Sequence, residues 1–434
     1  MNKNSLMRDD LFRGGSLIFL GMMTGSVFGY MFQITMGRML PVRTFGEMNA
    51  LFAIMIIFGV PFSSITNFLA RRISGYQALS LPGSANDMII RSYKNLLAPG
   101  AAIFLAGALL SKDISGYLKM QSMIPVVLLF LSVFVSVAVP VNTGILQGLR
   151  KFGMLSFVSA GSGVFKYVFC LVLVLMGMKL NGVMAGTILS VIVVGGLSFI
   201  PIGRHLRLGR VRAERPEGEV FNTVIPILLA NLSFALLSQV DMVAVKYFFT
   251  PREAGLYSSA AIIGKTVMYI PGAIVVSLFP LVASNRALNI GTLHLLLKAL
   301  GLTILLSGGG AAVLYFFPGP VVSFFFGSRF APAVHVVGFF AVAMMPLAVI
   351  SVIMNYNMAR GGRYFSYVML LCSMTQAAGM MLFHADVMDI LRVIFYTGLI
   401  CMAALFSLLA AEYYRGKARG FVPSAPPCLN KQDT

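Results

Sequence analysis

The chain has 434 residues, of which 58% are hydrophobic and only 11% are charged. A soluble protein of this length needs more polar surface than this composition supplies, so a water-soluble fold is excluded and lipid is the expected solvent. The formal net charge of +19 does not require nucleic-acid binding, because lysine and arginine accumulate in cytoplasmic loops and beside anionic lipid headgroups.

Apolar stretches long enough to cross a bilayer follow one another along the chain. A hydrocarbon core about 30 Å thick needs roughly 20 residues per helix, and segments with charged or turn residues separate the stretches. The sequence therefore predicts an all-α, polytopic membrane protein of twelve transmembrane helices. The predicted spans are 14–35, 48–69, 95–110, 123–147, 154–175, 183–203, 221–247, 257–283, 293–317, 333–358, 365–383 and 390–411.

The first span sets the expected orientation. Lys3, Arg8 and Arg13 precede it as they would a signal peptide, but no small-residue cleavage site follows before Arg38, so we expect the span to be retained. With the amino terminus inside, most of the 33 lysines and arginines fall in cytoplasmic segments. We expect an even number of crossings, with both termini on the cytoplasmic side of a bacterial inner membrane.

The longest polar stretch, 204–219, has charges of both signs together with a proline and a glycine. Such a composition is typical of a linker. It predicts an N-terminal six-helix bundle at 1–203 and a C-terminal six-helix bundle at 220–414. The proline-rich segment 415–434 is expected to be a disordered cytoplasmic tail.

A short internal repeat relates the two halves. Residues 37–48 read GRMLPVRTFGEM after the first span, and residues 246–257 read KYFFTPREAGLY after the seventh. Each copy has a cationic residue, a proline, an arginine and then a glycine, which is Gly46 in one and Gly255 in the other. Because both copies begin on the same side of the membrane, they predict two bundles around a central cleft, related by a pseudo-two-fold axis along the membrane normal.

The second copy of the repeat carries a family resemblance. Residues 239–265 read QVDMVAVKYFFTPREAGLYSSAAIIGK, with Pro271 and then Phe279 and Pro280 further on. This stretch resembles the seventh and eighth helices of the oligosaccharide-flippase, or polysaccharide-synthesis, family. That family belongs to the multidrug/oligosaccharidyl-lipid/polysaccharide exporter superfamily. Its members typically have an aspartate, a Pro-x-Glu-x-Gly-x-Tyr loop and a later Phe-Pro here.

The resemblance implies two six-helix bundles arranged in a V, alternating access, and a substrate made of undecaprenyl diphosphate carrying an oligosaccharide. Glycosyltransferases and a polysaccharide polymerase would act in the same pathway. The sequence has no motif that reads the glycan, so O-antigen of lipopolysaccharide, capsule and exopolysaccharide all remain open as the polymer served.

Two lysines near the bilayer midplane are the main candidate site residues. Lys166 lies roughly 18 Å into the fifth span and Lys265 roughly 15 Å into the eighth, where a charge is costly unless it faces a cavity or a partner. Facing a central cleft, both would make it cationic, as an anionic diphosphate requires. Alternatively, Lys265 pairs with Asp241 at similar depth in the neighbouring span. Protonation of Asp241 coupled to transport is a further hypothesis.

Polar side chains in the spans are candidate sugar contacts, although each also fits an interhelical hydrogen bond worth about 1 kcal/mol. They are Gln33, Asn67, Asn142, Asn231, Gln239, Asn355, Asn357 and Gln376. Arg71 and Arg72, at the cytoplasmic end of the second span, are candidates for capturing the diphosphate headgroup, and a topology signal explains them equally well. Tyr247 and Tyr257 are expected at the membrane interface.

Other functions fit the sequence less well. No cofactor, metal or catalytic residue is expected, because histidines and cysteines are scattered and a Gly-x-Ser-x-Gly elbow and a Walker loop are absent from the sequence. A membrane polymerase or ligase of sugar chains would normally need a long outer loop. A multidrug cation antiporter of the same superfamily would need acidic residues in its cavity, whereas the spans offer Asp241 against two lysines.

Overall fold

The computed structural model describes residues 3–78, 82–206, 219–272 and 292–418, together with Ile274 and Val282. All regular elements in these ranges are helices, which confirms the predicted all-α membrane fold. A helix satisfies its own backbone hydrogen bonds, and a span in lipid has no water to do so. In the described ranges nine segments are long and apolar enough to cross a membrane, or ten if one bent pair counts as a single span. The predicted total of twelve is consistent with this and stays a prediction.

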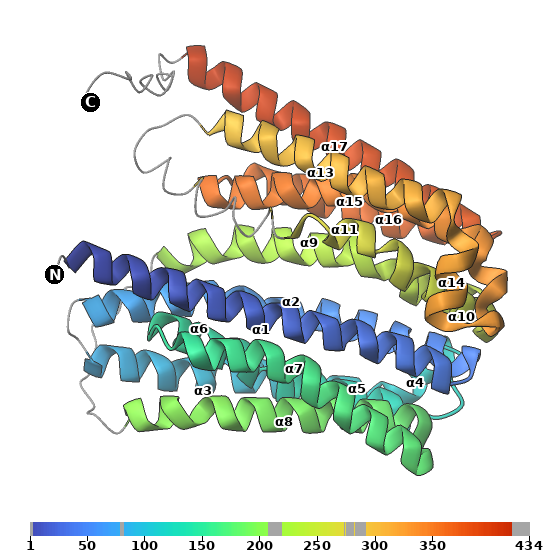
Figure 1. The fold of residues 1–434 in the computed structure, drawn as a ribbon, viewed down its shortest axis with the longest axis horizontal. Helices are drawn as coiled ribbons and strands as arrows, with labels where there is room; N and C mark the ends of the chain where they lie inside the picture. The colour runs from blue at the N-terminus through green and yellow to red at the C-terminus, as the bar shows by residue number, and fades with distance from the viewer. Residues whose placement is uncertain are drawn as a thin grey trace. The chain divides into compact units, whose positions relative to one another are not determined.

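Helices occupy each predicted span within the described ranges. They are α1 (Lys3–Met39), α2 (Val42–Ala78), α3 (Pro82–Leu109), α4 (Ser111–Tyr117), α5 (Ile124–Ser136), α6 (Ala138–Gly148), α7 (Phe152–Leu173), α8 (Lys179–Leu206), α9 (Glu219–Phe248), α10 (Pro251–Gly264), α11 (Thr266–Tyr269), α13 (Leu293–Phe316), α14 (Pro318–Phe326), α15 (Val334–Arg360), α16 (Tyr364–Leu382) and α17 (Val387–Ala418). Two short helices of other types are η1 (Val174–Met178) and η2 (Ser328–Ala333). Figure 1 shows their order along the chain.

The third helix departs most from its predicted bounds. The predicted span is 95–110, whereas α3 begins at Pro82 and runs through Pro99 to Leu109. It then bends by 63° into α4. A proline inside a membrane helix is tolerated because neighbouring helices and local adjustments satisfy the freed carbonyl groups. The break therefore comes at the C-terminal end of α3 and not at its proline.

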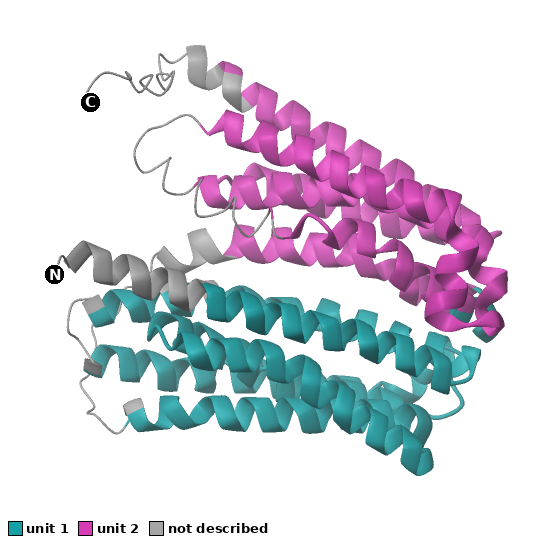
Figure 2. Ribbon diagram, in the orientation of Figure 1, with its two compact units in different colours: residues 1–224, 249–255 teal, residues 225–248, 256–434 magenta. Residues whose placement is uncertain are grey.

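The chain divides into two compact units (Figure 2). Unit 1 comprises residues 1–224 and 249–255, and unit 2 comprises residues 225–248 and 256–434. The segment 249–255, which follows α9 and includes the first residues of α10, belongs with the first unit, and the sequence did not predict this. Most of the predicted linker and nearly all of the predicted tail lie outside the described residues.

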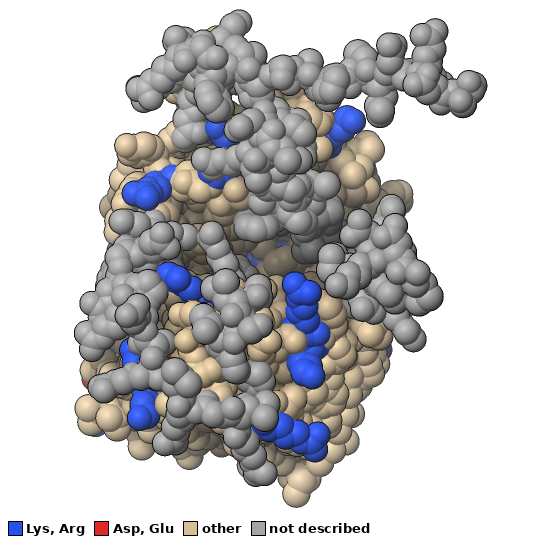
Figure 3. Space-filling view, turned by 90° about the vertical axis from the view of Figure 1, so that its left-hand side faces the viewer, with Lys and Arg blue, Asp and Glu red and all other residues tan. Residues whose placement is uncertain are grey.

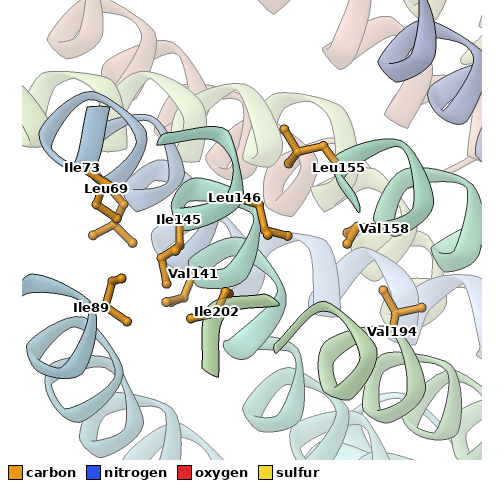
Figure 4. Packing of buried hydrophobic residues seen from close by; sticks show 10 residues of the cluster. All are labelled: Leu69, Ile73, Ile89, Val141, Ile145, Leu146, Leu155, Val158, Val194 and Ile202. Carbon is orange, nitrogen blue, oxygen red and sulfur yellow. The ribbon is translucent and has the colours of Figure 1, made fainter. Parts of the chain in front are cut away.

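In unit 1, α1 packs along α7 at very short range. A Cβ added to Gly163 of α7 would lie 2.4 Å from the backbone oxygen of Gly25 in α1. Only glycine permits this approach, which is the usual device for bringing membrane helices together. α7 also packs on α8, and α2 packs on α6. Buried aliphatic side chains from α2, α3, α6, α7 and α8 fill the space among them (Figure 4).

In unit 2, α15 is the central helix. It packs against α13, α17 and α11, and most of its side chains are buried, including Phe340, Leu347 and Ile353. It ends at Gly361, whose φ of 67° is a left-handed conformation that glycine adopts without strain. Because α15 is apolar on all sides, the other helices of the unit gather around it.

The two glycines of the internal repeat lie against each other within unit 1. A Cβ added to Gly46 of α2 would lie 2.7 Å from the backbone nitrogen of Gly255. A Cβ added to Gly255 would lie 2.0 Å from the backbone oxygen of Val42. The Lys119 ammonium donates to the backbone oxygen of Phe249 at 3.2 Å. These contacts hold the segment 249–255 on the first unit.

Candidate functional site

Lys166 projects from α7 toward two phenylalanine rings of unit 1. Its Nζ lies 3.9 Å from the centroid of the Phe52 ring on α2 and 4.5 Å from that of Phe32 on α1. Both are within the range of a cation–π interaction. Within the described ranges, no carboxylate forms an ion pair with Lys166. The charge is therefore held by aromatic faces and is not neutralised by an acid there.

Lys265 lies in a different environment in unit 2. Its Nζ is 2.9 Å from Oδ1 of Asp241 on α9, and the hydroxyl of Tyr257 on α10 donates to Oδ2 of the same carboxylate at 2.9 Å. Lys265 is 5% exposed, and Asp241 and Tyr257 are each 1% exposed. The alternative raised from the sequence, an ion pair between Lys265 and Asp241, is what the structure contains.

Helical periodicity explains how Tyr257 and Lys265 reach one carboxylate. They are eight residues apart with Ala261 between them, so all three lie on one face of the helix. The helical bond from the Lys265 amide to the Ala261 carbonyl, 2.8 Å, extends this face beyond the last residue of α10. Ala261 is fully buried, and its small side chain leaves room between the two long ones. The result is a satisfied buried network with no net charge.

The predicted sugar contacts do not all gather in one place. Asn142 of α6 bonds to side and main chains of neighbouring helices: its Nδ2 donates to Gly195 O at 2.9 Å and to Ser198 Oγ at 2.6 Å on α8, and its Oδ1 accepts from Tyr93 of α3. The structure thus places Asn142 where the interhelical alternative expects it. Asn355 donates to the Ser351 carbonyl one turn earlier, at 2.8 Å.

The remaining polar candidates differ in their burial and hydrogen bonding. In the described part of the chain the Gln33 Oε1 atom is buried and accepts no hydrogen bond, so it has spare capacity. Gln239 is buried and Asn231 partly buried. The side chains of Asn67 and Arg71 lie outside the described residues. No group of three or more metal-binding side chains occurs among those that are described.

Basic side chains collect where α2, α6 and α8 end and α3 and α7 begin. Arg72 belongs to this end of unit 1, and its guanidinium lies 5.8 Å from the centroid of the Phe68 ring. The others with described side chains are Arg91, Lys94, Arg150, Lys151 and Arg204. Figure 3 faces the ends of these helices and shows patches of lysine and arginine on the described surface. Arg91 pairs with Asp87 at 2.9 Å. Such an end attracts anionic headgroups.

Three residues of these arrangements were missed from the sequence. Phe32 and Phe52 could not be singled out, because the chain has 35 phenylalanines and most serve packing. Tyr257 was expected at the membrane interface, and this is wrong: it is buried and bonds to Asp241. Its spacing of eight residues from Lys265 was a signal that could have placed both on one helix face.

The fold is that of known membrane transporters. The inward-facing conformation of a multidrug resistance MATE family transporter of the MOP superfamily matches with a TM-score of 0.73 and 13% identity, over 92% of this chain and 98% of the other. An outward-facing conformation of such a transporter matches with a TM-score of 0.64 and 15% identity, over 95% and 97%. A MOP superfamily transporter from Pyrococcus furiosus, described as having a binding pocket of reverse polarity that suggests a different function, matches with a TM-score of 0.56 and 15% identity, over 93% and 96%.

These matches define the class: a multi-pass membrane protein with the fold of MOP-superfamily transporters. At such low identity they establish the fold alone. Residues 89–335 match the family described as polysaccharide biosynthesis protein. The chain belongs to that family. No curated protein matches it.

Proposed function

We propose that this protein is a flippase that moves a lipid-linked oligosaccharide across the bacterial inner membrane for cell-surface polysaccharide synthesis. Membership of a polysaccharide biosynthesis family supports the pathway, and the transporter fold supports the movement of a substrate across the membrane. Relatives of this fold occur in inward-facing and outward-facing conformations. Alternating access of this kind is the mechanism we propose here.

The observation that carries the proposal is the lone charge of Lys166. A transporter of organic cations needs carboxylates in its pathway. In the described membrane helices, however, the buried Asp241 is already engaged by Lys265 and Tyr257, and the buried Glu47 pairs with Arg43. Lys166 has no such acidic partner there. The sign of the uncompensated charge thus favours an anionic substrate over a multidrug cation, and a related transporter described as having reverse pocket polarity is a precedent within this fold.

The proposed substrate is undecaprenyl diphosphate carrying an oligosaccharide. Its diphosphate would bind Lys166, and Arg71 and Arg72 would capture it at the basic end shown in Figure 3. We place that end, and both termini, in the cytoplasm, where glycosyltransferases would supply the substrate and from which it would pass to a polysaccharide polymerase outside. In this proposal the protein itself is neither a polymerase nor a ligase of sugar chains, and other proteins carry out those reactions.

The experiment is a flipping assay in proteoliposomes that contain a fluorescent undecaprenyl-diphosphate oligosaccharide. Native protein should expose the label to an external quencher at a rate well above that of empty vesicles. Lys166→Ala should slow this exposure, whereas Lys112→Ala, which removes an exposed lysine of α4, should not. Ethidium uptake by the same vesicles, with no flipping of the labelled lipid, would instead establish a multidrug antiporter and overturn the proposal.

A further inference from the structure

The ammonium of Lys166 lies in a cage made by two rings from two other helices. Phe32 of α1 and Phe52 of α2 are 1% and 8% exposed. Their rings meet edge to face, with centroids 5.8 Å apart and an interplanar angle of 72°. Each also contacts the Lys166 charge, at 4.5 Å and 3.9 Å. The pair thus forms a rigid aromatic corner that fixes where the lysine ends.

An aromatic cage differs from a carboxylate because it leaves the positive charge of the lysine and some of its N–H donors available to a ligand. A ring face attracts a cation through its quadrupole and stabilises the charge in a place with little water. It carries no negative charge of its own, so the charge of the lysine is not cancelled. An ammonium group also has three N–H donors, and two ring faces do not saturate them. A phosphate oxygen can therefore still accept a charge-assisted hydrogen bond from Lys166.

We propose that Phe32 and Phe52 are positioning residues that keep Lys166 charged and pre-oriented for the diphosphate of the substrate. This inference rests on the proposed function, because it assigns an anionic ligand to Lys166. An unpaired lysine is costly inside the membrane. An acidic partner would lower that cost, but it would also neutralise the positive charge that binds the phosphate. Aromatic rings stabilise the ammonium without that loss.

The test replaces Phe52 with mono-, di- and trifluorophenylalanine by amber suppression. Each fluorine weakens the negative face of the ring while its size changes little. We expect the Kd for undecaprenyl diphosphate in nanodiscs to rise stepwise, by about tenfold over the series. The lipid concentration for half-maximal flipping should rise in parallel, with a smaller change in the maximal rate. Phe52→Tyr should keep near-native binding, and Phe52→Leu should lose it.

Phe130 of α5 is the matched control position. It is also a buried phenylalanine of unit 1, and it packs edge to face on Phe58 with centroids 5.7 Å apart. No cation in the described part of the chain lies over its ring. The same fluorinated series there should leave binding unchanged, and thermal stability should be equal for the two series.

Two results would overturn the inference, and they are distinguishable. A flat series at Phe52, with binding still lost in Lys166→Ala, would reduce the cage to packing and leave the proposed function standing. Binding and flipping that survive Lys166→Ala unchanged would overturn the anion site itself, and with it the role given to the two rings.

Discussion

Lys166 and Lys265 have the same chemistry and opposite surroundings. In unit 2, Lys265 is neutralised by Asp241, whose second oxygen accepts from Tyr257. In unit 1, the Lys166 ammonium lies over two ring faces, and within the described ranges it forms no ion pair with a carboxylate. The first arrangement is closed, because both carboxylate oxygens of Asp241 accept a hydrogen bond and Lys265 has a counter-ion. The second is open to a further anion, so the same residue type is structural in one unit and a candidate for binding in the other.

Removing the carboxylate should have the largest effect. Asp241→Ala leaves Lys265 buried without its counter-ion, and breaking a buried pair from one side costs about 3 kcal/mol or more. We expect a large fall in the thermal stability of detergent-solubilised protein, or failure to accumulate. The double variant Asp241→Ala with Lys265→Met should recover much of the loss, because it leaves no unpaired buried charge. A double-mutant cycle with no coupling energy would contradict the closed network.

Removing the other lysine should act on binding and not on folding. Lys166→Met breaks no ion pair known in the described ranges, so the free energy of unfolding should change little. Loss of a charged hydrogen bond to phosphate costs about 2 kcal/mol, which is about thirtyfold in Kd. Calorimetry with undecaprenyl diphosphate in nanodiscs measures it, with Lys112→Met as the control. A Lys166→Met protein as unstable as Asp241→Ala would show that the two lysines are alike.

The sequence predicted the helices well because lipid imposes a simple rule. Any apolar run of about 20 residues must be helical, and the helices from α5 to α9 begin and end within a few residues of the predicted spans. The same counting predicts similar depths for Lys265 and Asp241. Depth alone also suggested that Lys265 and Asp241 could pair, since adjacent antiparallel spans bring residues of equal depth together.

Which neighbours surround a residue was harder to predict. The rings of Phe32 and Phe52 reach Lys166 from α1 and α2, through contacts between segments more than a hundred residues away in the chain. No pattern in the sequence around Lys166 predicts these long-range contacts. Asn142 is a second example, because its partners lie on α3 and α8. From the sequence alone, a polar residue in an apolar span fits a sugar contact and an interhelical hydrogen bond equally well.

Tyr257 tests how far the closed network depends on its second donor. Tyr257→Phe keeps the ring, which packs on Phe340 with centroids 5.3 Å apart, and removes only the bond to Asp241. A hydrogen bond to a charged group is worth about 1.5 kcal/mol, so the loss in thermal stability should be about half that of Asp241→Ala. A Tyr257→Phe protein of native stability would show that Lys265 alone satisfies the carboxylate.

The smallest effect is expected at Glu253, an exposed carboxylate of unit 1 in the first turn of α10. Its Oε2 accepts from the Thr250 hydroxyl at 2.7 Å and from the Thr250 amide at 2.9 Å, while the Glu253 amide donates back to the Thr250 hydroxyl at 3.3 Å. This is a reciprocal helix cap. The hydroxyl bond first, and then the amide bond, hold the pKa of Glu253 below its usual value, against the opposing effect of partial burial.

A carboxyl group whose pKa is lower in the folded state stabilises the fold above its unfolded pKa, and this contribution is lost as the pH falls through the folded value. Thr250→Ala should therefore cost about 1 kcal/mol at neutral pH. The gap in melting temperature between native protein and Glu253→Gln should be largest near neutrality and should narrow below the ordinary glutamate pKa. If no gap opens at neutral pH, the cap depends on the geometry of the side chain and not on its charge, because the Glu253→Gln variant keeps an oxygen that can accept both bonds.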